Sequence, residues 1–196
     1  MSAKLRVGFI GCGGIANGKH MPALSKLANV EMVAFCDINP QRAKQAKISY
    51  GTPDAKVYTD YRALLQDTSI DAVHVCTPNR SHSLITVDAL QAGKHVLCEK
   101  PIARCAVELE TMLSAAQERG LVLLQAMRSA FLPTIPLLRE EIARIGPVRR
   151  ARFSYCQYSS RYDKFKNGII ENAFDPRLGN GALMDIGAYC VNLMVL

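Results

Sequence analysis

The sequence predicts an α/β protein: a doubly wound parallel sheet followed by an incomplete α+β second domain. Short apolar runs alternate with helical patterns from residue 4 to about residue 125. Such alternation is typical of parallel strands joined by crossover helices. A glycine-rich turn follows the first apolar run, as in many sheets of this kind. After residue 127 the alternation stops, and we expect a second domain to begin there.

Six strands are expected in the first part of the chain. They are the apolar runs 5–10, 30–36, 56–58, 72–76, 95–98 and 122–125. Helical patterns lie between them, at 15–28, 40–50, 61–66, 81–92 and 106–119. Asn39-Pro40 suits a helix start because proline matches the φ of a first turn. Gly93 and Gly120 stand where helix ends favour glycine.

The second part of the chain offers fewer elements. They are a helix over 133–145, a turn at 146–147, a strand over 148–158, a loop over 159–181 and an apolar helix over 182–196. One strand needs a partner layer for its apolar face. We therefore expect a C-terminally truncated polypeptide, with one domain over 1–126 and the beginning of a substrate and oligomerisation domain over 127–196.

Composition argues against several classes of protein. The 196 residues are 49% hydrophobic, enough for a sizeable core. No uncharged apolar stretch reaches the length of about 18 residues that a bilayer-spanning helix needs, and no secretory signal opens the chain. We therefore expect a cytoplasmic protein without a membrane partner. Seven cysteines without a CxxC pair suggest neither a disulfide framework nor a metal site.

The formal charge of +7 is densest in an arginine cluster between Arg139 and Arg152. Nucleic-acid binding through this cluster is one interpretation. No helix-turn-helix or aromatic RNA-binding pattern accompanies the cluster. We favour a solvated basic face that helps to attract anionic cofactors and substrates, and expect no nucleic-acid partner.

A phosphate-binding turn is predicted where the first strand passes into the first helix. Glycines in such a turn let the backbone approach a pyrophosphate, which the N–H groups of the helix N-terminus stabilise. The cofactor contacts expected in this turn are Gly11, Gly13, Gly14, Ile15 and Ala16. A tight turn without a ligand is the alternative. Strand, turn and helix in this order predict a Rossmann domain that binds NAD(P).

Asp37 ends the second expected strand, where a carboxylate can accept hydrogen bonds from the adenosine ribose hydroxyls. Its charge favours NAD over NADP, because a 2′-phosphate would meet like charge. Arg42, one turn into the next helix, is either a solvated arginine or a contact for that phosphate. We expect NAD, with NADP as the alternative.

Further candidate cofactor contacts follow later strands, since the carboxyl ends of parallel strands form the ligand-binding edge of such sheets. Thr77 and Asn79 follow the fourth expected strand, and Arg128 follows the sixth. His82 stands at a helix start, where a histidine is often a local cap. We include it among the candidate cofactor contacts.

Glu99-Lys100-Pro101 follows the fifth strand at the same edge. A Glu-Lys pair before a proline is often a surface turn. The other motifs at the same strand ends favour a functional site here. Glu99 is a candidate cofactor contact. Lys100 can hydrogen-bond a substrate hydroxyl that loses its proton, and a neighbouring carboxylate can tune the lysine.

Asp185 and Tyr189 stand four residues apart in the last expected helix, so they share a face and can point at one small ligand. A tyrosine near a lysine can move a proton. The structural alternative is an aspartate that favours the helix dipole and a tyrosine packed on the core. Spacing does not decide between the two.

Three motifs together resemble the Gfo/Idh/MocA oxidoreductase family. They are the glycine turn, Glu99-Lys100-Pro101 and the segment 181–189, GALMDIGAY. The resemblance implies a Rossmann domain followed by an open, mostly antiparallel sheet. It implies that Lys100 and Asp185 line the substrate site and that Tyr189 is the general acid/base. A tyrosine there is similar to the branch with glucose-fructose oxidoreductase, xylose dehydrogenases and dimeric dihydrodiol dehydrogenases, several of which use NADP.

The resemblance implies an NAD(P)-dependent oxidoreductase that transfers a hydride between nicotinamide and a carbinol or carbonyl carbon of a sugar, polyol or related diol. A full-length form is expected to be a homo-oligomer. The alternative is a nucleotide-binding, non-catalytic sensor or a truncated remnant.

Overall fold

A computed structural model describes residues 3–195 of the chain. The chain divides into two compact units, unit 1 (Met1–Gln125) and unit 2 (Ala126–Leu196). Residues 1, 2 and 196, which the expected domains and the last expected helix include, lie outside the described range.

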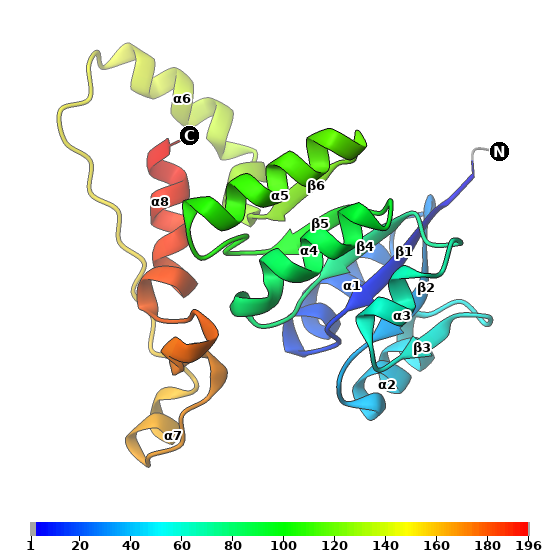
Figure 1. Ribbon diagram of the computed structural model, residues 1–196. Coiled ribbons are helices and arrows are strands. Elements are labelled where there is room, and N and C mark those ends of the chain that lie inside the picture. Colours follow the sequence, from blue (N-terminus) through cyan, green and yellow to red (C-terminus); the bar gives the residue numbers. More distant parts are fainter. Residues whose placement is uncertain (1–2, 196) are drawn as a thin grey trace. The chain divides into compact units, whose positions relative to one another are not determined.

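Unit 1 is built on a six-stranded sheet in the order β3-β2-β1-β4-β5-β6 (Figure 1). The strands are β1 (Leu5–Ile10), β2 (Val30–Cys36), β3 (Lys56–Tyr58), β4 (Ala72–Val75), β5 (His95–Glu99) and β6 (Leu123–Ala126). The pairs β1/β2, β1/β4, β2/β3 and β4/β5 are all parallel. The expected doubly wound parallel sheet is confirmed. The strand order reverses between β1 and β4, where sheets of this type bind their ligands.

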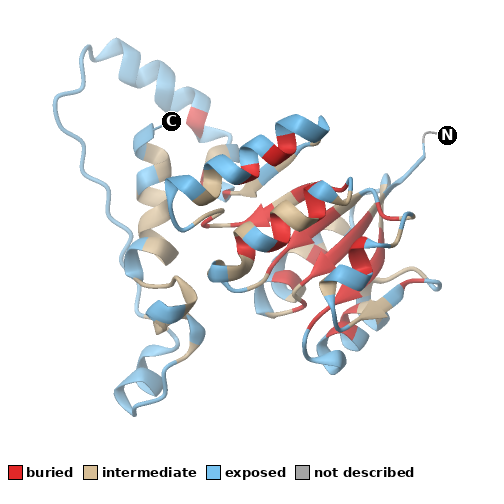
Figure 2. Ribbon diagram, in the orientation of Figure 1, coloured by how far each residue is buried: buried red, intermediate tan, exposed pale blue. Residues whose placement is uncertain are grey.

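Helices cover both faces of this sheet. They are α1 (Met21–Leu24), α2 (Pro40–Tyr50), α3 (Tyr61–Leu65), α4 (His82–Gln91) and α5 (Ala106–Arg119). Leu64, Leu90 and Ala116 bring α3, α4 and α5 into one apolar cluster with the sheet. Met21 and Ala43 bring α1 and α2 into a second cluster. Figure 2 shows buried residues along the strands and on the helix sides that face them.

Local capping explains where several helices begin and end. The Asn39 side chain accepts a hydrogen bond from the backbone N–H of Gln41 before α2, and Gly120 ends α5 with φ +62°. The expected helix over 15–28 is shorter than predicted. It consists of a π-helical turn, η1 (Ala16–His20), followed by α1, which ends at Leu24.

Unit 2 contains short helices and no strand after β6 within its described residues. Its elements are η3 (Arg128–Phe131), α6 (Thr134–Arg144), α7 (Tyr162–Lys166), η4 (Asn172–Phe174), η5 (Pro176–Leu178), η6 (Leu183–Gly187) and α8 (Ala188–Val195). The helix expected over 133–145 is confirmed as α6, and η6 with α8 forms the expected last helix. The predicted strand over 148–158 was wrong, because none of the described strands pairs with this exposed segment. The predicted loop 159–181 contains α7, η4 and η5.

Within residues 3–195, none of the helices combines the length and apolar character needed to cross a membrane.

Candidate active site

The glycine turn lies at the end of β1, beside the reversal point of the sheet. Gly11 has φ +94°, and its N–H donates to the Cys36 carbonyl oxygen at 2.8 Å. A Cβ at this position would lie 2.5 Å from the Cys76 carbonyl oxygen and 2.7 Å from its carbon. Because the obstacle is backbone of the chain leaving β4, only glycine fits here.

The outer side of the turn is open. Apart from neighbouring residues along the chain, no described atom lies within 4 Å of a Cβ built at Gly13 or Gly14, and Ile15 is exposed. Ala16 is fully buried beneath the turn, where η1 begins. An open glycine backbone at a helix start can receive a phosphate, so these residues fit the dinucleotide that the sequence predicts.

Asn17 stabilises the turn through side-chain hydrogen bonds, and this residue was not identified from the sequence. Its side-chain amide donates to the carbonyl oxygens of Cys12 at 2.6 Å and Gly13 at 3.1 Å. These bonds fix the direction of the peptides that precede the helix. A lone asparagine after a glycine turn carries no distinctive sequence signal.

Asp37 is held against the same turn, just after β2, and is only 8% exposed. Its Oδ2 accepts from the Cys12 N–H at 2.9 Å, and its Oδ1 accepts from the Asn39 N–H at 2.8 Å. A carboxylate has about four acceptor positions, so further hydrogen bonds to ribose hydroxyls remain available. Arg42 is exposed on α2. The predicted ribose contact therefore also holds the turn in place.

His82 makes backbone contacts that agree with the structural alternative, a local hydrogen-bonding residue, and one of these contacts reaches a second loop. It is 1% exposed, and its two ring nitrogens lie 2.8 Å from the carbonyl oxygens of Pro101 and Thr77. Thr77 also accepts a hydrogen bond from the Ser81 hydroxyl at 2.9 Å. Because both His82 nitrogens contact backbone, we assign this residue to joining the two strand-end loops. Asn79 begins a 3-10 turn, η2 (Asn79–Ser81), at the same edge.

Glu99 connects two functional segments at the end of β5. The carboxylate is 8% exposed, its Oε2 accepts from the Lys100 N–H at 2.9 Å, and its Oε1 lies 2.5 Å from Nε2 of His20. Sequence reasoning missed His20, which is 79 residues from its partner. Lys100 is partly buried, and the Lys100-Pro101 peptide is cis.

The remaining candidates lie in unit 2. Arg128 is exposed at the start of η3, Asp185 is in η6, and Tyr189 is in α8. The Tyr189 ring lies 5.8 Å from that of Tyr155. Since Lys100 belongs to unit 1, the meeting of these residues at one substrate stays a prediction.

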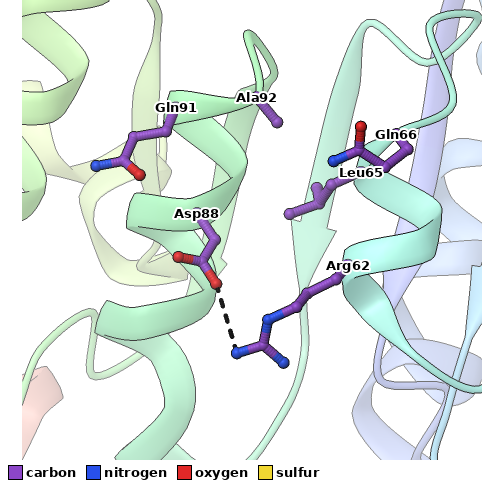
Figure 3. Close-up of a pocket in the computed structure, with 6 residues that line it drawn as sticks. All are labelled: Arg62, Leu65, Gln66, Asp88, Gln91 and Ala92. Carbon is purple, nitrogen blue, oxygen red and sulfur yellow. Dashed lines mark ion pairs between the residues drawn. The ribbon is translucent and has the colours of Figure 1, made fainter.

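A separate cavity of about 360 Å³ lies between α3 and α4 (Figure 3). It is lined by Arg62, Leu65, Gln66, Asp88, Gln91 and Ala92. The Arg62 guanidinium and the Asp88 carboxylate are 4.0 Å apart across it. None of the strand-end candidates lines this cavity, so it is distinct from the expected cofactor site.

Comparisons with known proteins agree with this geometry. The sequence profile of the Gfo/Idh/MocA oxidoreductase family, NAD-binding Rossmann fold, matches residues 5–127. The NADP(+)-dependent scyllo-inositol 2-dehydrogenase IolU of Bacillus subtilis (strain 168) is 38% identical over 187 residues, which cover 95% of this chain and 56% of that protein. Mouse trans-1,2-dihydrobenzene-1,2-diol dehydrogenase is 33% identical over 196 residues, covering 97% of this chain and 55% of its own length.

A solved structure is also similar. KijD10, a 3-ketoreductase from Actinomadura kijaniata crystallised with NADP and TDP-benzene, superposes with a TM-score of 0.67 at 32% identity. The superposition covers 72% of this chain and 42% of that one. The chain thus spans about half the length of the curated relatives that it matches.

Proposed function

Because this chain belongs to the Gfo/Idh/MocA oxidoreductase family, with its NAD-binding Rossmann fold, we propose that it carries the cofactor site and the catalytic residues of an NAD(P)-dependent dehydrogenase. The substrate class is a sugar, polyol or related diol. The proposal extends to a homo-oligomeric full-length form and a cytoplasmic location.

The glycine turn is the observation that carries this proposal. The backbone of Cys76 leaves no room for a side chain at position 11, so Gly11 is required there. Gly13 and Gly14 leave the outer side of the turn open. An empty tight turn would not require an open side together with a buried carboxylate. These features favour a bound pyrophosphate on the turn and a ribose on Asp37.

We propose NAD as the preferred cofactor. Asp37 is fixed by two backbone N–H groups, so its carboxylate cannot easily turn away from a 2′-phosphate. The NADP named for IolU and KijD10 is the reason to test both dinucleotides. Arg42 is the candidate contact if NADP is preferred.

In the proposed mechanism the nicotinamide, when bound, supplies hydride acceptor or donor chemistry. Lys100 donates a hydrogen bond to the reacting substrate oxygen, and Tyr189 moves the proton of that oxygen. Asp185 orients the substrate through a second hydroxyl. Glu99 acts as a positioning residue, because its Oε2 fixes the backbone N–H of Lys100.

Cofactor binding is the first test. The chain has no tryptophan, so NADH and NADPH fluorescence can be followed without indole emission. We expect tighter binding of NADH, and a smaller difference between the two dinucleotides in Asp37→Ala. Arg42→Ala is the matched control and should leave NADH binding unchanged. No binding of either dinucleotide by the folded chain would contradict the cofactor site.

Turnover is the second test. Substrates suggested by the relatives' names are inositols and trans-dihydrodiols. We expect Lys100→Met and Tyr189→Phe to lower kcat by at least about a hundredfold, the usual contribution of acid-base groups, with the NADH Kd unchanged. Wild-type turnover in both variants would overturn the catalytic assignments. NADH binding without turnover on any substrate in a full-length form would favour the non-catalytic sensor.

A further inference from the structure

Three potential metal ligands meet in unit 1 on the face of the sheet that α1 covers. His74 is in β4 and Cys76 directly follows that strand, so the two side chains point to the same face. His20 ends η1. One ligand atom from each of these three residues lies within 4.8 Å of those of the other two.

His74 has an unusual environment for a polar side chain. It is 1% exposed, and neither ring nitrogen has a hydrogen-bond partner among the described residues. Its ring lies 5.1 Å from that of Phe9 and 4.1 Å from that of His20. Buried polar groups nearly always have a hydrogen-bond partner, because leaving one without a partner is energetically costly. The orphaned nitrogens therefore point to a missing partner.

The three side chains offer donor atoms of the kind that bind a transition-metal cation. A metal would bind a lone pair of each imidazole and the thiolate of Cys76, so binding would release the thiol proton to solvent. His74 is 1% exposed and Cys76 is 8% exposed, so a bound ion would be shielded from bulk water.

We propose that His20, His74 and Cys76 form a binding site for a borderline-soft divalent metal ion, Zn²⁺ by their ligand chemistry. Imidazole nitrogen and thiolate sulfur are both zinc ligands, and a site with three protein ligands leaves a fourth position for water. Donor atoms around tetrahedral zinc are about 3.5 Å apart, so metal binding would draw these side chains together by about 1 Å.

Glu99 contacts one of the proposed ligands, His20, through its carboxylate. Metal-bound histidines usually donate their second ring N–H to a carboxylate, which fixes the ring orientation. The 2.5 Å contact between Glu99 Oε1 and His20 Nε2 has this form, and in such an arrangement Nδ1 of His20 would be the metal ligand. The sequence predicted no metal site because the three ligands come from separate segments without a CxxC or HxxH spacing.

The test is a Co²⁺ titration of the reduced, metal-free full chain. We expect a thiolate-to-cobalt charge-transfer band that saturates at one equivalent, visible bands typical of tetrahedral Co²⁺, and loss of both on adding Zn²⁺. Cys76→Ser should abolish the charge-transfer band. His74→Phe, which suits its apolar surroundings, should weaken Co²⁺ binding at least about tenfold.

Two variants serve as matched controls outside the cluster. Cys105→Ser removes an exposed cysteine and His95→Gln removes another histidine of the same sheet, so both should titrate like wild type. Zn²⁺ should also raise the Tm of wild type more than that of His74→Phe at the same concentration, because it binds the folded state and the variant binds it more weakly. This second measurement decides the matter if Cys76→Ser fails to fold.

Two outcomes would overturn the proposal. A charge-transfer band of full strength in folded Cys76→Ser would place the metal on another cysteine. The absence of any band in wild type, with no effect of Zn²⁺ on Tm, would assign the partner of His74 to a buried water.

Discussion

Unit 1 and unit 2 use similar apolar side chains in opposite ways. Phe9 and Met112 of unit 1 are fully buried, whereas Phe131 and Ile145 of unit 2 are 73% and 77% exposed. Unit 1 has helices on both faces of a sheet. In unit 2 the described residues form short helices and an unpaired extended segment (Figure 2). The difference shows that apolar side chains are buried only where a second layer of secondary structure packs against them.

The contrast extends to polar interactions and turns. Asp67 of unit 1 and Asp163 of unit 2 are each bound by a lysine and a tyrosine. Gly11 of unit 1 and Gly146 of unit 2 each have a positive φ. In unit 1 these features are packed against other chain segments, and in unit 2 they lie in solvent. Matched substitutions therefore separate the effect of the residue from the effect of its surroundings.

The largest effect is expected from removing an aromatic ring. Phe9→Ala should lower the free energy of unfolding by about 3–5 kcal/mol, because it opens a cavity in a packed core. Phe131→Ala should change it by less than about 0.5 kcal/mol. Urea unfolding followed by far-UV circular dichroism measures both. Equal losses would mean that unit 2 is packed in solution, and the comparison would fail.

A smaller effect is expected from adding one methyl group to a glycine. Gly11→Ala should cost about 3 kcal/mol, since backbone strain adds to the contact with Cys76. Gly146 has φ +81° with nothing within 4 Å of a new Cβ, so Gly146→Ala should cost only about 1 kcal/mol. The same urea titrations apply. If Gly146→Ala costs as much as Gly11→Ala, the turn is not sterically special.

The smallest effect concerns acid stability. The hydrogen bond from Lys56, followed by that from Ser69, lowers the pKa of Asp67 in the folded state. Its stabilisation is therefore present at neutral pH and is lost as pH falls below about 4, the usual range of a free aspartate. Asp67→Asn should cost about 1–2 kcal/mol at pH 7 and less at low pH.

Asp163 provides the control for this prediction. Its pKa is also lowered, first by Lys166 and then by Tyr158, but it is fully exposed. Asp163→Asn should leave the urea midpoint unchanged from neutral to acidic pH, because solvent screens exposed ion pairs. If Asp163→Asn lost its acid dependence and Asp67→Asn did not, the acid-dependent stabilisation would belong to Asp163 and not to Asp67.

The pattern of apolar residues was enough to predict the sheet of unit 1. Strands covered by helices on both faces appear in the sequence as short apolar runs such as 72–76, and these runs can be recognised without knowing their partners. The strand predicted over 148–158 failed because alternation creates a strand only where another strand accepts its hydrogen bonds. The same distinction applies to the site. Gly11 and Asp37 follow local rules of a strand–turn–helix unit. The Glu99 partner of His20, by contrast, is 79 residues away in the sequence.

The two hydrogen bonds to Asp37 set a limit on redesigning the cofactor preference. The carboxylate that would discriminate between the dinucleotides also anchors the N–H of Cys12 in the glycine turn. A protein engineer who neutralises this position for NADP would loosen the turn in the same step. Asparagine keeps a single acceptor oxygen for two N–H donors, so a second substitution would have to restore the lost anchor.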